Sequence, residues 1–252
     1  MTEITPLKPF RRFNFARISE VLFQPQRTFA EIAGESYSTW LTPMLALSLS
    51  ALLSIFVSGY LTSRAAMMGE VSLPRDWQYW TPDMQNNYMQ AQQAMQGTVF
   101  VYVIPLILAL IGIWLGWLIL SGLLHLGSTL LGGRGSMQGA LNIVAWASLP
   151  FMLRDVLRLI FMLLADHAIV SPGLSGFSGN AVFVAQLLSR LDVFFLWSAV
   201  LLVIGFGVAD GLPRNKAIVG VMIILFILLL TQSGLGMLTS NMGGLAVQRP
   251  LF

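Results

Sequence analysis

Long runs of apolar residues, separated by short polar segments, occupy most of the chain beyond its first 39 residues. Two of these runs, Trp40 to Leu61 and Ala217 to Leu238, each hold 22 residues without a charged side chain. About 20 apolar residues are enough for a helix to cross the hydrocarbon core of a bilayer. A third run, Val99 to Leu131, holds 33 residues and predicts one helix that extends beyond the membrane at one end. These three runs predict three transmembrane helices.

Two further apolar runs, Ala140 to Leu164 and Val182 to Ala209, are long enough to cross a bilayer but contain charges. We call these charges the charged group: Arg154, Asp155, Arg158, Arg190 and Asp192. With these two runs, the sequence predicts an all-α, polytopic integral membrane protein that forms a bundle of five transmembrane helices.

Polar segments divide the chain into three predicted parts. Residues 1–38 form a cytoplasmic N-terminal amphipathic extension, residues 39–240 form the five-span membrane domain, and residues 241–252 form an extracytoplasmic C-terminal tail. Within the membrane domain, Thr62 to Gly97 is polar and predicts an extracytoplasmic loop. Its second half, Asp83 to Gln96, lacks Gly and Pro and is rich in good helix formers, so we expect a helix there.

The N-terminal extension has apolar residues at helical spacing, interrupted at Pro25. The apolar positions are Phe15, Ile18, Val21, Leu22, Phe29 and Ile32. Arg11, Arg12 and Arg17 lie beside them, which is typical of a helix on an anionic membrane surface. The same pattern fits a helix that packs on the protein's own cytoplasmic loops, and the sequence leaves both arrangements open.

Charged residues are scarce and unevenly placed. Only 10% of the residues are charged, against about 25% in an ordinary soluble domain. Lys and Arg concentrate on the side that holds the N-terminus, which predicts a cytoplasmic N-terminus and, after five crossings, a C-terminus outside. The residues on that side are Lys8, Arg11, Arg12, Arg17, Arg27, Arg134, Arg214 and Lys216. We therefore expect a multi-pass membrane protein without a nucleic-acid partner.

The segment "GGRGS", Gly132 to Ser136, has the composition of a phosphate-binding loop but not its pattern. A Walker loop requires G-x-x-x-x-G-K-[ST] after a strand, and the dinucleotide fingerprint requires G-x-G-x-x-G. Here the lysine is missing and position 138 is Gln138. The segment instead predicts a turn between membrane helices, in which a glycine ends one helix, Arg134 faces the membrane surface and Ser136 caps the next helix.

Other catalytic signatures are also missing from the sequence. The chain has no cysteine, which excludes thiolate metal sites and cysteine nucleophiles. His125 and His167 do not form a zinc motif, and Ser136 lacks the G-x-S-x-G context of a hydrolase nucleophile. The sequence therefore predicts a protein that is not an enzyme and that uses no cofactor or metal ion.

A charge at the centre of a span costs about 2.5–3.5 kcal/mol on insertion scales, and less near the membrane interface. Arg154 lies 15 residues beyond Gly139, about 22 Å along a helix, and therefore in the outer half of the bilayer. Pro150 can interrupt the helix just before it. The charged group predicts either a lipid-headgroup or partner site, or an interhelical ion-pair clasp in which Asp192 neutralises an arginine.

Four stretches of the chain occur in a characteristic order. They are "LFQPQRTFAEIA" with Pro25, Thr28, Phe29 and Ile32, then "LGGRGSMQGALNIVAWASLP", then "LWSAVLLVIGFGVADGLPRNKA", and last the apolar final span. In order and spacing they resemble the Yip1 family of small multi-span membrane proteins, in particular its bacterial branch. The resemblance covers most of Pro25 to Leu238.

This resemblance implies a five-span helical bundle of the bacterial cytoplasmic (inner) membrane, with a role in membrane organisation and no enzymatic activity. Eukaryotic members bind prenylated Rab-type GTPases in vesicle trafficking, and some bacterial members act as accessory subunits of ABC-type export systems. We therefore expect a membrane protein that scaffolds or regulates a partner membrane complex, with an ABC transporter as the candidate partner. The alternative is a transporter or lipid-handling protein that uses Arg154, Arg158, Arg190 and Asp192.

Candidate contacts to a partner or to membrane lipids are the charged group and four residues of two polar turns, the GGRGS turn and the turn from Asp210 to Lys216. We expect these two turns to pack together. The four residues are Arg134, Ser136, Arg214 and Lys216.

Overall fold

The regular structure of the described chain is entirely helical, which confirms the predicted all-α fold. The computed structural model describes residues 13–35, 37–69, 73–74, 76–169, 171–179 and 181–245, with side chains up to residue 238. Its α-helices are α1 (Ala16–Phe23), α2 (Pro25–Ala33), α3 (Leu41–Met67), α4 (Pro82–Met95), α5 (Ile104–Leu130), α6 (Met137–Ala147), α7 (Leu149–Ala165), α8 (Val182–Leu188), α9 (Val193–Ala209) and α10 (Arg214–Leu245). Short helical turns are η1 (Trp77–Tyr79), η2 (Val99–Val103) and η3 (Ser175–Phe177).

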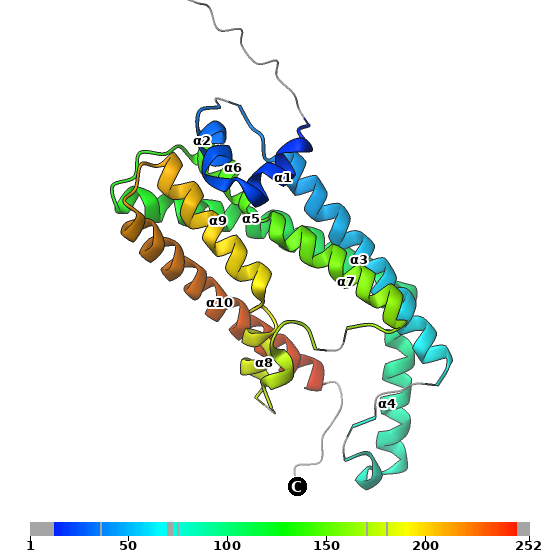
Figure 1. Ribbon diagram of the computed structural model, residues 1–252. Coiled ribbons are helices and arrows are strands. Elements are labelled where there is room, and N and C mark those ends of the chain that lie inside the picture. Colours follow the sequence, from blue (N-terminus) through cyan, green and yellow to red (C-terminus); the bar gives the residue numbers. More distant parts are fainter. Residues whose placement is uncertain are drawn as a thin grey trace, which may run out of the picture.

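The long helices run between two ends of the molecule (Figure 1). One end, which we call the N-face, holds α1, α2 and the turns that join α5 to α6 and α9 to α10. The other end, which we call the arm face, holds α4, which projects away from the bundle. The N-face is therefore built from short helices and turns, and the arm face carries a projecting helix.

Three helical segments are long and apolar enough to cross a membrane, namely Leu41–Met67, Val99–Leu130 and Arg214–Leu238. They correspond to the three uncharged runs of the sequence. The pair α8 and α9, bent by 59°, adds a fourth span if it counts as one. Three or four candidate spans therefore stand among the described residues, where the sequence predicts five.

The ends of several elements differ from the predicted ones. α3 continues past Leu61 to Met67, so the polar loop starts later than expected. α10 continues to Leu245, so the tail predicted from residue 241 begins inside this helix. α4 covers the expected helix of the loop to within one residue at each end. The remainder of the tail, residues 246–252, and residues 1–12 of the predicted extension lie outside the described residues.

The predicted span Ala140 to Leu164 is divided into two helices. α6 ends at Ala147, α7 begins at Leu149, and Pro150 lies in the first turn of α7. Proline is tolerated in a first turn because the N–H that it lacks has no helical acceptor there, whereas in a helix interior it breaks a hydrogen bond. Neither helix alone qualifies as a membrane span.

α3 and α7 pack side by side along the bundle (Figure 1). At the arm face their ends are joined by an ion pair of 2.5 Å between Arg64 Nη1 and Asp166 Oδ1. Asp166 ends α7 in the left-handed conformation, with φ at 57°. Because α6 starts at the N-face turn and α7 ends beside Arg64, the two helices together extend from one end of the molecule to the other.

α6 forms the centre of the N-face half of the bundle. Its residues from Ile143 to Ala147 are fully buried, where α6 packs against α5, α9 and α2. α9 approaches α6 so closely at Gly205 that a Cβ atom there would collide with Ile143. From α5, the indole N–H of Trp117 donates to the carbonyl of Leu141 at 2.9 Å. This arrangement fixes the N-face turns on a packed core.

Candidate functional site

The two polar turns of the N-face pack together, as expected from the sequence. The backbone N–H of Arg134 donates to the carbonyl of Asp210 at 3.1 Å. The ammonium group of Lys216 donates to the carbonyl of Leu131 at 2.9 Å. Ser136 caps α6 by accepting a hydrogen bond of 3.0 Å from the backbone N–H of Gly139. The GGRGS segment is therefore a helix-to-helix turn in contact with a second turn.

A buried carboxylate lies between these turns. Asp210 is 5% exposed, and its carboxylate accepts a short hydrogen bond from the hydroxyl of Ser128 on α5. A Cβ atom at Gly135 would overlap this carboxylate, and a Cβ atom at Gly133 would overlap the Ser128 hydroxyl. The glycines are thus needed because the turn crosses directly over buried polar groups. We call this contact of Ser128, Asp210 and the GGRGS turn the N-face latch.

The N-face latch lacks the geometry of a hydrolase site, although a serine, a histidine and an aspartate meet there. In a catalytic triad the histidine accepts the serine proton and the aspartate orients the histidine. Here Ser128 donates to Asp210 itself, and Nδ1 of His125 is buried without a hydrogen-bond partner. Burial raises the pKa of Asp210, and the Ser128 hydrogen bond and the charge of His125 offset this only in part.

The sequence did not single out Ser128 or Asp210 as partners, since 82 positions separate them. The only local signal was the pair of glycines on both sides of Arg134. Among the described residues, no group of three or more His, Asp or Glu side chains could hold a metal ion.

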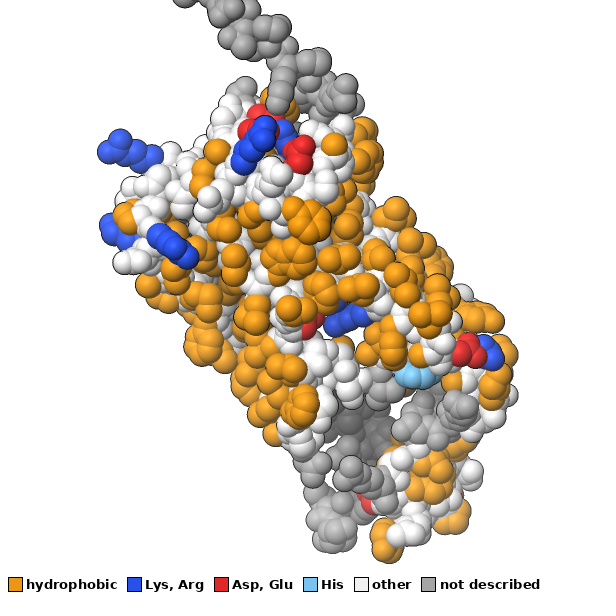
Figure 2. Space-filling view, viewed as in Figure 1, with side chains coloured by type: hydrophobic (Ala, Val, Ile, Leu, Met, Phe, Trp, Pro, Cys, Tyr) orange, Lys and Arg blue, Asp and Glu red, His pale blue; other side chains and the backbone are white. Residues whose placement is uncertain are grey.

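The predicted contact residues of the two turns lie on the surface. Arg134, Ser136, Arg214 and Lys216 are all exposed, and Figure 2 shows lysine and arginine side chains that project from this end of the molecule. The charged groups of Arg134, Arg214 and Lys216 therefore face the surroundings. Of the three, Lys216 also donates to a backbone carbonyl.

Four members of the charged group form one cluster, which we call the ionic tetrad: Arg154, Asp155, Arg158 and Asp192. Arg154 Nε lies 3.3 Å from Asp155 Oδ1. Asp192 Oδ2 lies 3.6 Å from Arg154 Nη1 and 3.7 Å from Arg158 Nη2. Charged side chains of both signs meet in the middle of an otherwise apolar face in Figure 2. Asp192 thus faces both arginines, where the sequence suggested one.

Asp192 has a second structural role at the start of α9. Its Oδ1 accepts a hydrogen bond of 2.8 Å from the backbone N–H of Phe195 and so caps the helix. Arg154 also lies over the ring of Phe151, with 4.9 Å from its guanidinium carbon to the ring centroid. We interpret the ionic tetrad as an interhelical clasp between α7 and the break before α9.

Arg190, the fifth member of the charged group, does not join the ionic tetrad. Its Nη1 donates to Oε1 of Gln232 on α10 at 2.8 Å. The structure therefore brings four of the five predicted residues together and directs Arg190 to a different helix.

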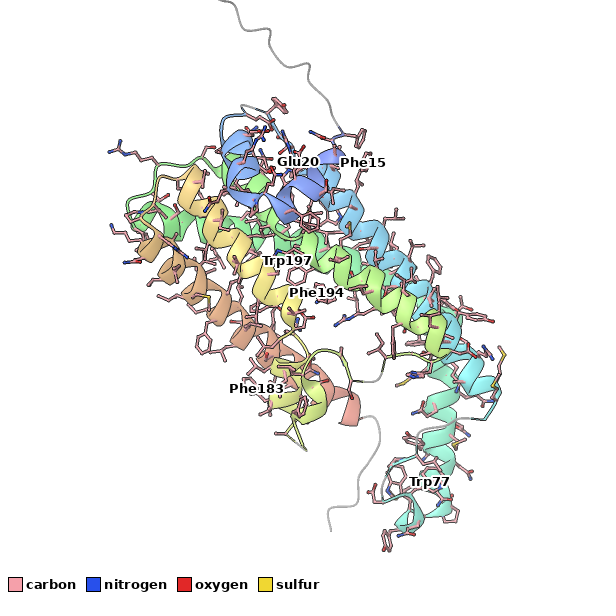
Figure 3. The ribbon with its side chains drawn as sticks, in the orientation of Figure 1. Phe15, Glu20, Trp77, Phe183, Phe194 and Trp197 are labelled. Carbon is pink, nitrogen blue, oxygen red and sulfur yellow. The ribbon has the colours of Figure 1, made fainter. Side chains whose placement is uncertain are left out.

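The N-terminal helices pack on the protein's own bundle. Val21, Phe29 and Ile32 are buried to 99% or more, and α2 lies against α9 and α6. Phe15 stands exposed at the start of α1, next to the first turns of α3 (Figure 3). Of the two arrangements that the sequence left open, the apolar face of these helices takes the packed one.

A buried ion pair holds α1 against the segment after α2. Two hydrogen bonds of 2.9 and 2.6 Å join the guanidinium of Arg17 to the carboxylate of Glu35, and the Arg17 guanidinium lies 5.8 Å from the centroid of the Trp146 ring. Burial alone would lower the pKa of Arg17, but the hydrogen bonds and charge of Glu35 outweigh it, so the pKa is raised. The sequence pointed to Arg17 as a membrane contact and missed this pair.

The segment between α2 and α3 is attached to α6 by hydrogen bonds. The amide of Asn142 accepts from the backbone N–H of Thr39 at 2.9 Å and donates to the carbonyl of Tyr37 at 3.2 Å. The indole of Trp146 donates to the Thr39 hydroxyl at 3.0 Å. These three hydrogen bonds dock the segment that follows α2 on α6.

At the other end of the molecule, α4 and the turn before it form a projecting arm. The rings of Trp77, Trp80 and Tyr88 lie 5.5–5.6 Å apart, centroid to centroid. The side-chain amide of Gln85 donates to the carbonyls of Trp77 and Trp80 at 3.1 and 3.4 Å. Figure 3 shows Trp77 at the far end of the arm. We call this aromatic unit the arm tip.

These features define a polytopic helical membrane protein whose buried polar groups pair across helices. The family model of the Yip1 domain matches residues 19–235, which is most of the chain. The protein therefore belongs to the Yip1 family. No curated protein and no solved structure matches the chain.

Proposed function

We propose that this protein is a non-enzymatic membrane protein that scaffolds or regulates a partner membrane complex. The observation that carries the proposal is the arm. No residue of α4 is buried, so the helix contributes little to the bundle from which it projects. A folded arm tip on a helix of this kind is suited to contact with another molecule.

The composition of the arm tip supports a protein partner. Tyr and Trp are enriched at the centres of protein interfaces because they combine a large apolar area with a polar group. Tyr79 of η1 is 79% exposed. It lies two positions after Trp77, whose ring is packed in the arm tip. The tip therefore presents an aromatic side chain on a rigid aromatic base.

We further propose five membrane crossings, a cytoplasmic N-face and an extracytoplasmic arm, in the inner membrane of a bacterium. The combined course of α6 and α7 from the N-face to the arm face supports the fifth crossing. The exposed cations of the N-face support the orientation, because Lys and Arg near membrane helices are retained on the cytoplasmic side. Those cations are Arg27, Arg134, Arg214 and Lys216.

The family likeness, in which some bacterial members are accessory to ABC-type export systems, favours such an exporter as the partner. The arm would then contact the exporter outside the cytoplasm, and the exposed cations of the N-face would contact it or the inner-leaflet lipids within. The scaffold proposal does not depend on which complex is bound.

Site-specific photo-crosslinking in native membranes tests the proposal. A photoreactive residue at Tyr79 is expected to crosslink a protein, identified by mass spectrometry, that also co-purifies in mild detergent. The matched control is Phe177 of η3, which is 85% exposed but does not belong to the arm. Trp77→Ala with Tyr79→Ala is expected to reduce co-purification at least fivefold. Crosslinking that is equal at both positions, or full co-purification with the double variant, would contradict the proposal.

A further inference from the structure

Within the charged group, the ionic tetrad has equal numbers of positive and negative side chains, whereas Arg190 has no counter-ion among the described residues. The ionic tetrad contains two arginines and two aspartates, and each aspartate lies within 4 Å of an arginine. The tetrad is therefore neutral as a whole, and an additional anion would have to displace a carboxylate. Arg190 stands outside this balance.

Arg190 is a cation without a counter-ion among the described residues. Its only side-chain hydrogen bond to these residues goes to the neutral amide oxygen of Gln232, and its Nε is buried without an acceptor. A guanidinium has five N–H donors, so most of its donors remain open to a ligand. Charged groups at membrane depth normally pair with an opposite charge or reach a polar interface.

The depth of Arg190 follows from its contact with α10. Gln232 lies 18 residues beyond Arg214, where α10 begins at the N-face, which corresponds to about 27 Å along the helix. The hydrocarbon core is about 30 Å thick. The Arg190–Gln232 pair therefore lies near the arm-side boundary of the hydrocarbon, where lipid phosphates begin.

The surroundings of the pair face lipid. Gln232 itself is exposed, and the large apolar residues near it on α10, Leu230, Leu235 and Leu238, are exposed as well. Exposed apolar side chains on a membrane helix contact acyl chains. A phospholipid whose chains cover this part of α10 would bring its phosphate to Arg190.

The turn that carries Arg190 is held in place from the other side. The backbone N–H of Leu174 donates to the carbonyl of Leu188 at 2.9 Å. Gly173, with φ at 61°, approaches the carbonyl of Ser189 so closely that a Cβ atom there would lie 2.7 Å from it. The residues just before Arg190 are thus packed between η3 and α10, which fixes the backbone that carries the guanidinium before any ligand binds.

We propose that Arg190, with Gln232 beside it, binds the phosphate group of a phospholipid in the arm-side leaflet. The guanidinium donates two parallel hydrogen bonds to the phosphate oxygens, and the amide NH₂ of Gln232 donates a further one. The lipid phosphate supplies the negative charge that the protein does not supply at this position. The site holds a lipid against the break between α8 and α9 and does not depend on the scaffold role of the arm.

Native mass spectrometry of the purified protein with added lipid tests this site. The probes are a phosphatidylglycerol and a diacylglycerol with the same acyl chains, which differ in the phosphoglycerol headgroup. The wild-type protein is expected to retain the phosphatidylglycerol at least tenfold better than the diacylglycerol. Arg190→Gln is expected to abolish this preference, and Arg190→Lys to retain part of it, because a lysine keeps the charge but not the paired donors.

A control variant, a second site variant and a folding check make the result specific. Arg64→Gln removes an arginine of the same face that already has a carboxylate partner and is expected to leave the preference unchanged. Gln232→Leu keeps the charge of Arg190 and is expected to weaken retention severalfold. Circular dichroism and size-exclusion profiles like those of the wild type establish that each variant is folded.

Two outcomes would overturn the proposal. If Arg190→Gln retains phosphatidylglycerol as well as the wild type does, Arg190 does not bind the lipid. If inorganic phosphate at millimolar concentration displaces the lipid from the wild-type protein, the site takes a soluble anion and not a lipid headgroup. Neither outcome affects crosslinking at Tyr79, so the failure of this site is distinguishable from the failure of the scaffold proposal.

Discussion

The N-face and the arm face hold their polar groups in opposite ways. At the N-face, Asp210 is buried beneath the GGRGS turn, and Arg17 and Glu35 have side chains that are only 7% and 15% exposed. At the arm face, the ion pair of Arg64 and Asp166 has side chains that are 40% and 57% exposed. The N-face thus encloses the carboxylate of Asp210 and the ion pair of Arg17 and Glu35, although its other cations are exposed. The ion pair of the arm face is in contact with the surroundings.

This difference predicts a rigid N-face and an arm face whose polar groups are accessible to other molecules. A buried polar group stabilises only the arrangement that supplies its partner, because the loss of the partner leaves it desolvated and unpaired. The N-face is therefore committed to one arrangement of α1, α2, α6 and the two turns. An exposed pair can be lost at little cost, because water replaces the partner. The arm face is free to exchange such contacts for those of a partner molecule.

The largest effect is expected from a methyl group added at the N-face latch. In Gly135→Ala the new Cβ overlaps the buried carboxylate of Asp210, and overpacking of this kind costs about 3 kcal/mol or more when neither neighbour can move. We expect a lower thermal unfolding midpoint in detergent, measured by circular dichroism. Gly207→Ala on α9 is the control, because a Cβ there meets only ordinary van der Waals contacts, at 3.9 Å from the Leu212 carbonyl oxygen and 4.0 Å from Ala217 Cβ.

A second variant shows whether the overlap with the carboxylate is the cause. Asp210→Ala removes the colliding atoms, so Gly135→Ala is expected to cost much less in that background. If the cost of Gly135→Ala is the same with and without Asp210, the latch does not explain the glycine.

Local signals in the sequence predicted the ends of several elements correctly. Pro150 marks the start of α7, Ser136 caps α6, and the absence of Gly and Pro defines α4, because each of these effects acts within one helical turn. The predicted contact between the two polar turns was also correct, since short turns on the same side of a bundle lie close together.

The partners of the polar groups were much harder to predict. Helical spacing in the N-terminal extension showed that one face is apolar, but the same face suits a membrane surface or a protein core. Ser128 lies on α5 and Asp210 in the turn after α9, and no sequence pattern near either residue indicates the other. Arg190 and Asp192 are two positions apart, yet the bend of the chain sends them to different helices.

The second effect compares the buried ion pair with the exposed one. Arg17→Ala leaves Glu35 largely buried without its cationic partner, and the loss of one member of a buried pair costs about 3 kcal/mol. Arg64→Ala at the arm face is expected to cost less than about 1 kcal/mol, because both of its groups are substantially exposed. Thermal unfolding of both variants in the same detergent measures the difference. Equal costs would show that the two ends do not differ in the way described.

A smaller and more local effect is expected at the arm tip. Trp80→Ala removes two ring contacts, each of which contributes about 0.5–1.5 kcal/mol beyond the burial of area. Because α4 buries no residue, we expect faster amide hydrogen exchange in α4 and an unchanged unfolding midpoint of the bundle. Phe177→Ala, at an exposed position of the same face, is the control and should alter neither. A fall of the bundle's midpoint in Trp80→Ala would show that the arm is part of the core.

The smallest effect concerns the pH dependence of the N-face latch. Burial raises the pKa of Asp210 above its usual value of 3.8. A carboxyl group with a higher pKa in the folded chain binds its proton more tightly when folded, so its contribution to stability is fully present below pH 3.8 and is lost as the pH rises through the raised pKa. Asp210→Asn keeps an acceptor for Ser128 but does not titrate. The stability of the wild type relative to this variant is therefore expected to increase as the pH is lowered from neutral toward 4. Unfolding midpoints of both proteins across this range measure the difference, and His125→Gln controls for the neighbouring histidine. A relative stability that decreases on acidification would mean that the folded protein stabilises the charged form of Asp210. Burial at the N-face would then not disfavour a charge, and the contrast with the arm face would fail for this residue.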